Sequence, residues 1–132
     1  MEKNIQRLIL GNRELLTIVV AAIFLRLIFI STWLEDWDSV QFVLALNHYS
    51  ISEHLPHPPG YPLYILLGKL FNLIFFDGAM ALTIMSVVLG SLTVIPLFLL
   101  AKEMFDKKVA LLASLLFIVT PIHWTLSEVV LT

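Results

Sequence analysis

The sequence lacks cysteine and carries few charged residues for its length. The absence of cysteine excludes disulfide bonds, thiolate metal sites and a cysteine nucleophile. Charged residues make up 14% of the 132 residues and form no basic patch of the nucleic-acid-binding type. The sequence also contains no glycine-rich phosphate loop, internal repeat or low-complexity stretch. We therefore expect no nucleic-acid partner, and any chemistry must come from acids, histidines and a few basic residues.

Hydrophobic residues dominate the composition. They make up 59% of the sequence, and the mean hydropathy of +0.93 is more than a soluble domain of this length can bury. Crossing a hydrocarbon core takes roughly 20 apolar residues of helix, and such windows lie at 14–34, 79–101 and 109–127. A fourth apolar run, 61–76, gives only about 24 Å of helix. The composition predicts an all-α integral membrane protein with three transmembrane helices.

Basic residues favour a cytoplasmic N-terminus, because positive charge in short loops tends to stay in the cytoplasm. They cluster at two places, within 3–13 and within 102–108: Lys3, Arg7 and Arg13, and Lys102, Lys107 and Lys108. Both clusters are cytoplasmic if the run 61–76 lies in the membrane interface, which makes 102–108 a cytoplasmic loop and 35–78 a long external loop. The first apolar window is too long for a signal-peptide core, so we interpret it as a retained helix. The prediction is a multi-pass protein of the cell membrane.

The external loop is polar and rich in proline, and two local helices are expected in it. The spacing of Asp38 and Gln41 is that of a capping box, which would open a juxtamembrane helix over 38–48. Pro62 suits the first turn of a second juxtamembrane helix over 61–76. Pro96 and Pro121 should kink the second and third transmembrane helices.

Several segments together resemble a known family. They are 38–45 (DSVQFVLA), 57–63 (HPPGYPL), 99–105 (LLAKEMF) and 107–113 (KKVALLA). These segments are similar to the N-terminal part of the polytopic type C glycosyltransferases of the protein O-mannosyltransferase and aminoarabinose-transferase kind. The resemblance implies transfer of a sugar from a polyprenyl-phosphate donor to a protein, lipid or glycan acceptor at the outer membrane face. Relatives continue through many more helices, so we expect an N-terminal piece of a larger enzyme that is inactive alone.

The resemblance also implies roles for particular residues. Asp38 matches the acid that acts as general base in inverting attack by the acceptor. This family often places a second acid directly after it, whereas this chain has Ser39, so Asp36 is kept as the alternative base. Substrate-binding roles are expected for four residues, with His57 or Lys69 near the donor phosphate: His57, Tyr61, Lys69 and Arg26. Glu128 stands near the place of a second functional acid in relatives.

Simpler interpretations stay open beside these roles. Asp38 could only cap its helix, and the motif at 57–62 could only be a rigid turn. Arg26 could extend to the polar loop or pair with an acid there. A divalent metal would suit the oxygen and imidazole donors at Asp36, Asp38, His54 and His57, although their spacing matches no known metal motif. The alternative function is a small non-enzymatic membrane scaffold or subunit whose acidic external loop binds a partner. A transporter fragment is disfavoured because the ionisable residues gather in the loop.

Overall fold

The protein is mostly helical in the part that a computed structural model describes, residues 13–31, 33–34, 36–127 and 129–130. The helices are α2 (Arg13–Ile28), α3 (Trp37–Asn47), the short 3-10 helix η1 (Ile51–Glu53), α4 (Pro62–Phe75), α5 (Gly78–Leu92), α6 (Val94–Met104), α7 (Lys107–Ile118) and α8 (Pro121–Leu126). No strand occurs in these residues, and an isolated bridge joins Ser50 to Leu55. The predicted all-α class is therefore confirmed.

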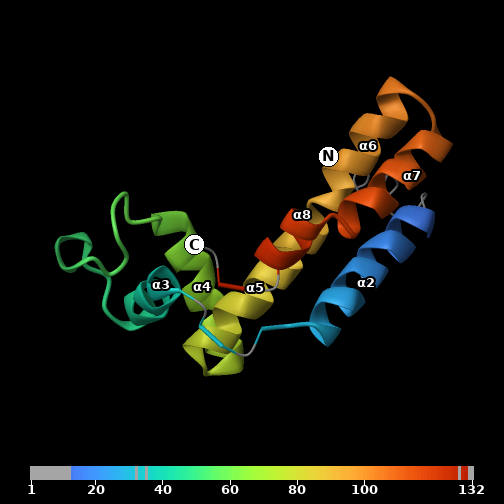
Figure 1. Cartoon of the computed structure of the whole chain (residues 1–132). Coiled ribbons are helices and arrows are strands. Elements are labelled where there is room, and N and C mark those ends of the chain that lie inside the picture. The colour runs from blue at the N-terminus through green and yellow to red at the C-terminus, as the bar shows by residue number, and fades with distance from the viewer. Residues whose placement is uncertain (1–12, 32, 35, 128, 131–132) are drawn as a thin grey trace.

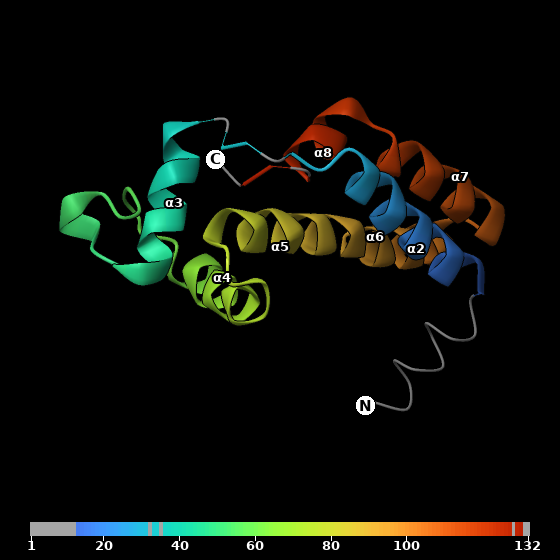
Figure 2. The same cartoon turned by 90° about the horizontal axis from the view of Figure 1, so that it is seen from below.

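The helices form two groups that share one long rod. α5 and α6 follow one another along this rod (Figures 1 and 2). α7 packs beside α6 at one end, α2 lies against both α6 and α5, and α3 and α4 pack against α5 at the other end. α8 runs back along α5, which brings the described C-terminal residues close to α3 and α4 (Figure 1).

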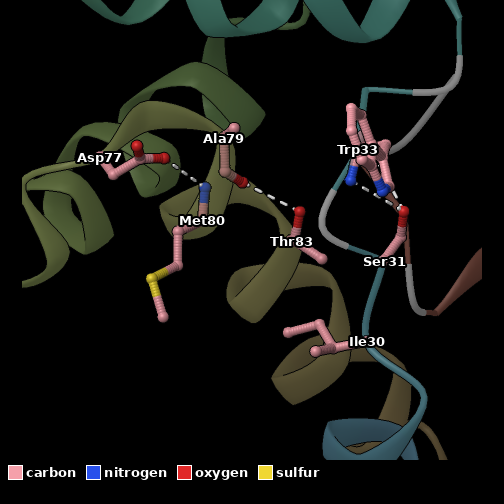
Figure 3. Close-up of a pocket in the computed structure, with 7 residues that line it drawn as sticks. All are labelled: Ile30, Ser31, Trp33, Asp77, Ala79, Met80 and Thr83. Atoms are coloured by element: carbon pink, nitrogen blue, oxygen red, sulfur yellow. Dashed lines mark hydrogen bonds between the residues drawn. The ribbon is translucent and has the colours of Figure 1, made fainter.

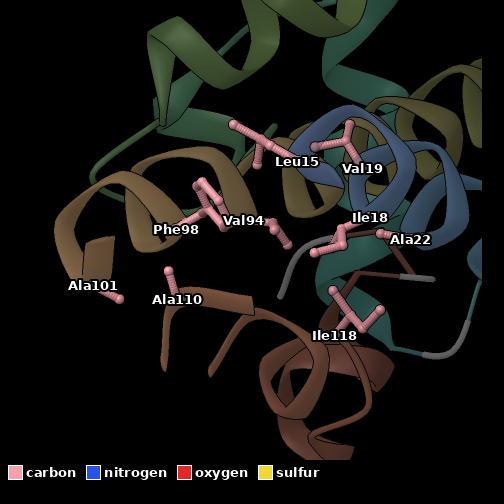
Figure 4. Packing of buried hydrophobic residues seen from close by; sticks show 9 residues of the cluster. All are labelled: Leu15, Ile18, Val19, Ala22, Val94, Phe98, Ala101, Ala110 and Ile118. Atoms are coloured by element: carbon pink, nitrogen blue, oxygen red, sulfur yellow. The ribbon is translucent and has the colours of Figure 1, made fainter. Parts of the chain in front are cut away.

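Each group has its own apolar core. The core between α2, α6 and α7 consists of fully or largely buried side chains (Figure 4): Leu15, Ile18, Val19, Ala22, Val94, Phe98, Ala101, Ala110 and Ile118. The other core joins α3, α4 and α5 to the C-terminal segment: Phe42, Ala45, Leu46, Ile65, Leu82, Met85 and Val130. The second core fixes the position of α3, which begins the polar region.

Within the described residues, one helical stretch is long and apolar enough to cross a membrane. It runs from Gly78 to Met104 through α5 and α6, with 27 residues and a mean hydropathy of 2.4. Pro96 has no N–H to donate to the carbonyl oxygen of Leu92, and the helix is interrupted at Thr93. In its apolar window, 33% of the residues are buried inside the protein.

The first and third expected membrane spans are not confirmed. The helix described in the first, α2, ends at Ile28, and the chain beyond it turns where the Ser31 hydroxyl donates to the carbonyl oxygen of Trp33 and accepts from its N–H. The third is divided between α7 and α8 by a break before Pro121. Large apolar side chains nevertheless face outward on α2, α4 and α7: Leu16, Val20, Phe24, Leu63, Leu66, Leu70, Leu112, Leu115 and Leu116. The three-span arrangement stays a prediction.

The turn between α6 and α7 is shorter than the expected loop 102–108. Only Phe105 and Asp106 lie outside the two helices. Asp106 accepts a hydrogen bond from the N–H of Val109 at 2.8 Å and so caps α7. An exposed ion pair between Lys107 and Glu14, 2.7 Å long, ties this turn to the start of α2.

Helices occupy both ranges where juxtamembrane helices are expected, but one of them starts differently. Pro62 lies in the first turn of α4, as predicted. The capping box is wrong: Asp36 stands at the N-cap of α3 without a side-chain cap bond, which places Asp38 inside the first turn. Gln41 does not reach back to the helix start, because its side-chain oxygen binds the backbone of His57.

Candidate active site

The polar loop brings together an acid and a histidine that are distant in sequence. Asp38 Oδ1, in the first turn of α3, lies 3.6 Å from Nδ1 of His57, in the loop before α4. The side chain of Asp38 is 44% exposed and that of His57 is 26% exposed. A solvent-accessible carboxylate beside an imidazole can accept a proton and stabilise charge, which are the functions of an acid–base site.

Backbone hydrogen bonds fix the conformation of the loop that carries His57. Ser50 and Leu55 exchange two backbone hydrogen bonds, of 2.8 and 2.9 Å, which close the loop around η1. The N–H of Gly60 donates to the carbonyl oxygen of His57 at 3.0 Å and closes the next turn. Gly60 has φ +91°, where a Cβ is strained, so glycine is required there. The motif at 57–62 is therefore a rigid turn, and the turn also positions His57.

Gln41 connects this turn to α3. The backbone N–H of His57 donates to Gln41 Oε1 at 3.1 Å, and the same oxygen lies 3.3 Å from His57 Nδ1. Gln41 is 7% exposed, so the amide is fixed in the protein interior. Sequence reasoning assigned Gln41 to a capping box and missed this contact, because nothing in the local pattern indicates a partner 16 residues away.

Phe42 is the buried aromatic residue against which the other rings of the site pack. Its ring is 1% exposed and meets three other rings edge to face, with centroid distances of 5.7 Å to His57, 5.3 Å to Tyr61 and 5.0 Å to Tyr64. His57 and Tyr61 are themselves 5.3 Å apart. Tyr61 adopts the left-handed conformation, with φ 42°, directly before α4. The structure thus brings Tyr61 to His57, as a shared role would require.

The other expected site residues lie apart from this pair. Asp36 is exposed at the start of α3. Lys69 is exposed on α4 and lines a separate hollow of about 200 Å³. Within the described residues, no hydrogen bond or ion pair joins Lys69 to Asp38 or His57. Arg26 is fully buried in α2 and donates to the carbonyl oxygen of Ala22 at 3.2 Å, so its guanidinium does not extend to the surface. Glu128 lies outside the described residues.

The expected metal donors do not form a metal site. Asp36, Asp38, His54 and His57 are all described, yet the described residues contain no group of three or more His, Asp or Glu side chains that could hold a metal ion. The donor set therefore does not fit a divalent metal.

A cavity of about 320 Å³ lies between the segment after α2 and the start of α5 (Figure 3). Its lining combines apolar, hydroxyl, carboxylate and indole groups: Ile30, Ser31, Trp33, Asp77, Ala79, Met80 and Thr83. Asp77 also accepts a hydrogen bond from the N–H of Met80 at 2.8 Å and caps α5. Trp33 and Asp38 are five Cα-to-Cα steps apart along the chain, so their Cα atoms lie within about 19 Å. The size is at the lower end of the range for ligand pockets, roughly 300–1,000 Å³.

Comparison with known protein families identifies the class of this protein and the family to which it belongs. Residues 38–128, more than half of the chain, match the family model described as "Protein O-mannosyl-transferase TMEM260 N-terminal domain". The predicted class, a glycosyltransferase N-terminal region, is confirmed at this coarse level. The chain belongs to the TMEM260 N-terminal domain family. No curated protein and no solved structure matches the chain.

Proposed function

We propose that this chain is the N-terminal part of a membrane glycosyltransferase of the type C kind, which moves a sugar from a polyprenyl-phosphate donor to an acceptor hydroxyl at the outer membrane face. The observation that carries the proposal is the pairing of Asp38 with His57 within the range that matches the O-mannosyl-transferase family. The family description favours mannose as the sugar and a protein as the acceptor.

Asp38 acts as general base in this proposal. Its carboxylate takes the proton of the acceptor hydroxyl, and the hydroxyl oxygen forms a bond to the anomeric carbon of the sugar. The bond between that carbon and the phosphate oxygen breaks, and the lipid phosphate leaves with the electron pair. One displacement of this kind inverts the anomeric configuration. The exposed position of Asp38 at the start of α3 supports this role, because a base must reach its substrate's proton.

His57 contacts the leaving phosphate in this proposal. Charge develops on the phosphate as the sugar departs, and a positioned hydrogen-bond donor stabilises it. The ring centroid of Tyr61 lies 5.3 Å from that of His57. In this proposal the two rings line the substrate site together. Lys69 and Arg26 are assigned no step in the reaction, because the described contacts do not bring them to the pair. The neighbouring cavity offers room for the sugar.

The membrane arrangement follows from the same proposal. A lipid-linked donor keeps its tail in the bilayer, so its phosphate can be met only at the interface. We place the stretch from Gly78 to Met104 across the membrane and α3 and α4 along its outer surface. The N-terminus then lies in the cytoplasm, and the regions 14–34 and 109–127 supply two further spans. The apolar outer surfaces of α2, α4 and α7 support contact with lipid.

The proposal is tested by determining which sugar donor the enzyme uses. Membranes that contain the full-length enzyme, of which this chain is proposed to be the N-terminal part, are incubated with radiolabelled polyprenyl-phosphate mannose, and label transferred to protein is measured against membranes without that enzyme. We expect transfer that depends on the protein and on the lipid donor. Transfer of label from a nucleotide sugar, when formation of the lipid-linked sugar is blocked, would refute the proposal.

A further inference from the structure

The segment after α8 contacts the helix that carries the candidate base. The hydroxyl of Ser39, in the first turn of α3, donates to the backbone carbonyl oxygen of Val130 at 3.4 Å, although the two residues are 91 positions apart in the sequence. Ser39 directly follows Asp38 and is 1% exposed, so this hydrogen bond is shielded from water. A third segment therefore adjoins the candidate site, besides α3 and the turn at 57–62.

Apolar packing holds the same segment. Val130 is 2% exposed and belongs to the core that α3, α4 and α5 share. Phe42, which contacts the rings of His57 and Tyr61, belongs to that core as well. The segment is therefore attached in two ways, by the hydrogen bond at Ser39 and by the burial of Val130. A buried carbonyl group that loses its donor is costly, so the Ser39 hydroxyl matters for this attachment.

A close approach between α8 and α5 sets where the segment lies. A Cβ on Gly90, in α5, would lie 2.7 Å from the Cβ of Ser127, the residue directly after α8. Because the Cβ of Ser127 is bonded directly to the backbone, it cannot move aside as the end of a long side chain can. A larger residue at position 90 would therefore displace the end of α8, and residues 129 and 130 with it.

The start of α3 has little restraint of its own. In the described structure Asp36, the N-cap residue, makes no side-chain cap bond, and the backbone hydrogen bond from Val40 to its carbonyl oxygen is 3.4 Å long. Within 36–40 only Ser39 is buried. The first turn of a helix lacks partners for its N–H groups unless a cap or another segment supplies a restraint. The contact between Ser39 and Val130 supplies one here.

We propose that Ser39 is a positioning residue, which docks the segment after α8 onto the first turn of α3 and so fixes the turn from which Asp38 reaches the substrate. The proposal rests on the proposed function, since it concerns how the general base is held. Displacing a reacting group by about 1 Å can cost roughly 100-fold in rate, so loss of the contact lowers kcat. Donor binding changes less, because backbone hydrogen bonds of its own fix the loop that carries His57.

The first experiment measures whether the hydroxyl holds the segment. The sequence has no cysteine, so Val130→Cys, in the full-length enzyme freed of any other cysteine, gives one buried thiol. Its rate of labelling by a water-soluble maleimide reports release of the segment. Ser39→Ala in this background should speed labelling roughly fivefold, the equivalent of one net hydrogen bond. The matched control is Ser114→Ala, which removes a fully buried hydroxyl on α7 that has no hydrogen-bond partner in the described structure and should leave labelling unchanged.

The second experiment measures kcat and the donor KM of the full-length enzyme with radiolabelled polyprenyl-phosphate mannose. Ser39→Ala should lower kcat at least roughly fivefold and change the donor KM less than about twofold, whereas Ser114→Ala should match the wild-type enzyme. Gly90→Ala tests the same contact from the far side of α8. It displaces Ser127 without altering α3, and it should both speed labelling of the cysteine at 130 and lower kcat.

The outcomes separate this proposal from the proposed function. If Ser39→Ala and Ser114→Ala are labelled at the same rate, the Ser39 hydroxyl does not hold the segment and the proposal is wrong. If Ser39→Ala is labelled faster but keeps the wild-type kcat, or raises only the donor KM, the contact serves the fold alone and the proposal is equally refuted. If the wild-type enzyme transfers no sugar from the lipid donor, the proposed function fails, whereas the labelling rates still decide whether Ser39 docks the segment.

Discussion

Replacing Gly60 by alanine should open the loop that carries His57. Gly60 has φ +91°, a conformation that costs an L-residue about 1–3 kcal/mol. A Cβ at this position would also lie 2.7 Å from both Ile51 Cδ1 and Tyr49 Oη. Both of these atoms end flexible side chains that can move aside. The backbone conformation therefore sets the cost, and the steric contact adds less.

The assay is hydrogen exchange at the backbone amides of the loop. Ser50 and Leu55 donate to one another's carbonyl oxygens, so their amides report opening of the loop. A cost of 1–3 kcal/mol corresponds to roughly five- to 150-fold faster exchange. Sugar transfer should fall as well, because His57 loses the turn that fixes its position.

Ser52→Ala is the matched control in the same loop. The Ser52 hydroxyl contacts only the Ser50 hydroxyl in the described structure, at 3.1 Å on the surface, so its removal should change stability by less than about 0.5 kcal/mol. If Gly60→Ala exchanges no faster than Ser52→Ala, the positive φ does not hold the loop and the reasoning is wrong.

Two further substitutions test the packing around the site. Phe42→Ala removes the buried ring that contacts His57, Tyr61 and Tyr64 and should destabilise the protein by about 3–5 kcal/mol in a detergent unfolding titration; a loss below 1 kcal/mol would show that the aromatic cluster contributes little. Asp77→Ala removes the cap of α5 and should cost about 1 kcal/mol in the same titration, whereas Asp77→Asn keeps a capping oxygen and should cost less; equal losses would contradict the capping role.

Local sequence patterns were enough to predict the helices of the polar loop. The prolines and glycine at 56–62 exclude a continuous helix, and the apolar run after Pro62 forms α4. Likewise Pro96 and Pro121 mark the places where helices are interrupted. These outcomes depend on the backbone restrictions of single residues, which the sequence displays directly.

Other features depended on contacts that local patterns do not reveal. α2 ends at Ile28, and the chain beyond it turns at a Ser31–Trp33 hydrogen bond, features that a hydropathy window ignores. The partnership of Gln41 with His57 spans 16 residues, and the capping-box spacing pointed to a different use of the same side chain. Asp38 and His57 were both selected from the sequence, but only the fold shows that they are neighbours. A tertiary contact of this kind depends on how α3 packs against α4.

The most direct test of the account is the rate of sugar transfer by the full-length enzyme with Asp38→Asn. The substitution keeps the size of the side chain and removes its basicity, and a general base contributes about 10²- to 10⁴-fold to the rate. Asp106→Asn, which retains the cap of α7 at the opposite end of the rod, is the control. With radiolabelled polyprenyl-phosphate mannose as donor, the account predicts a loss of at least about 100-fold in kcat for Asp38→Asn and an unchanged rate for the control. Transfer by Asp38→Asn at the wild-type rate, particularly with a loss in Asp36→Asn, would contradict it.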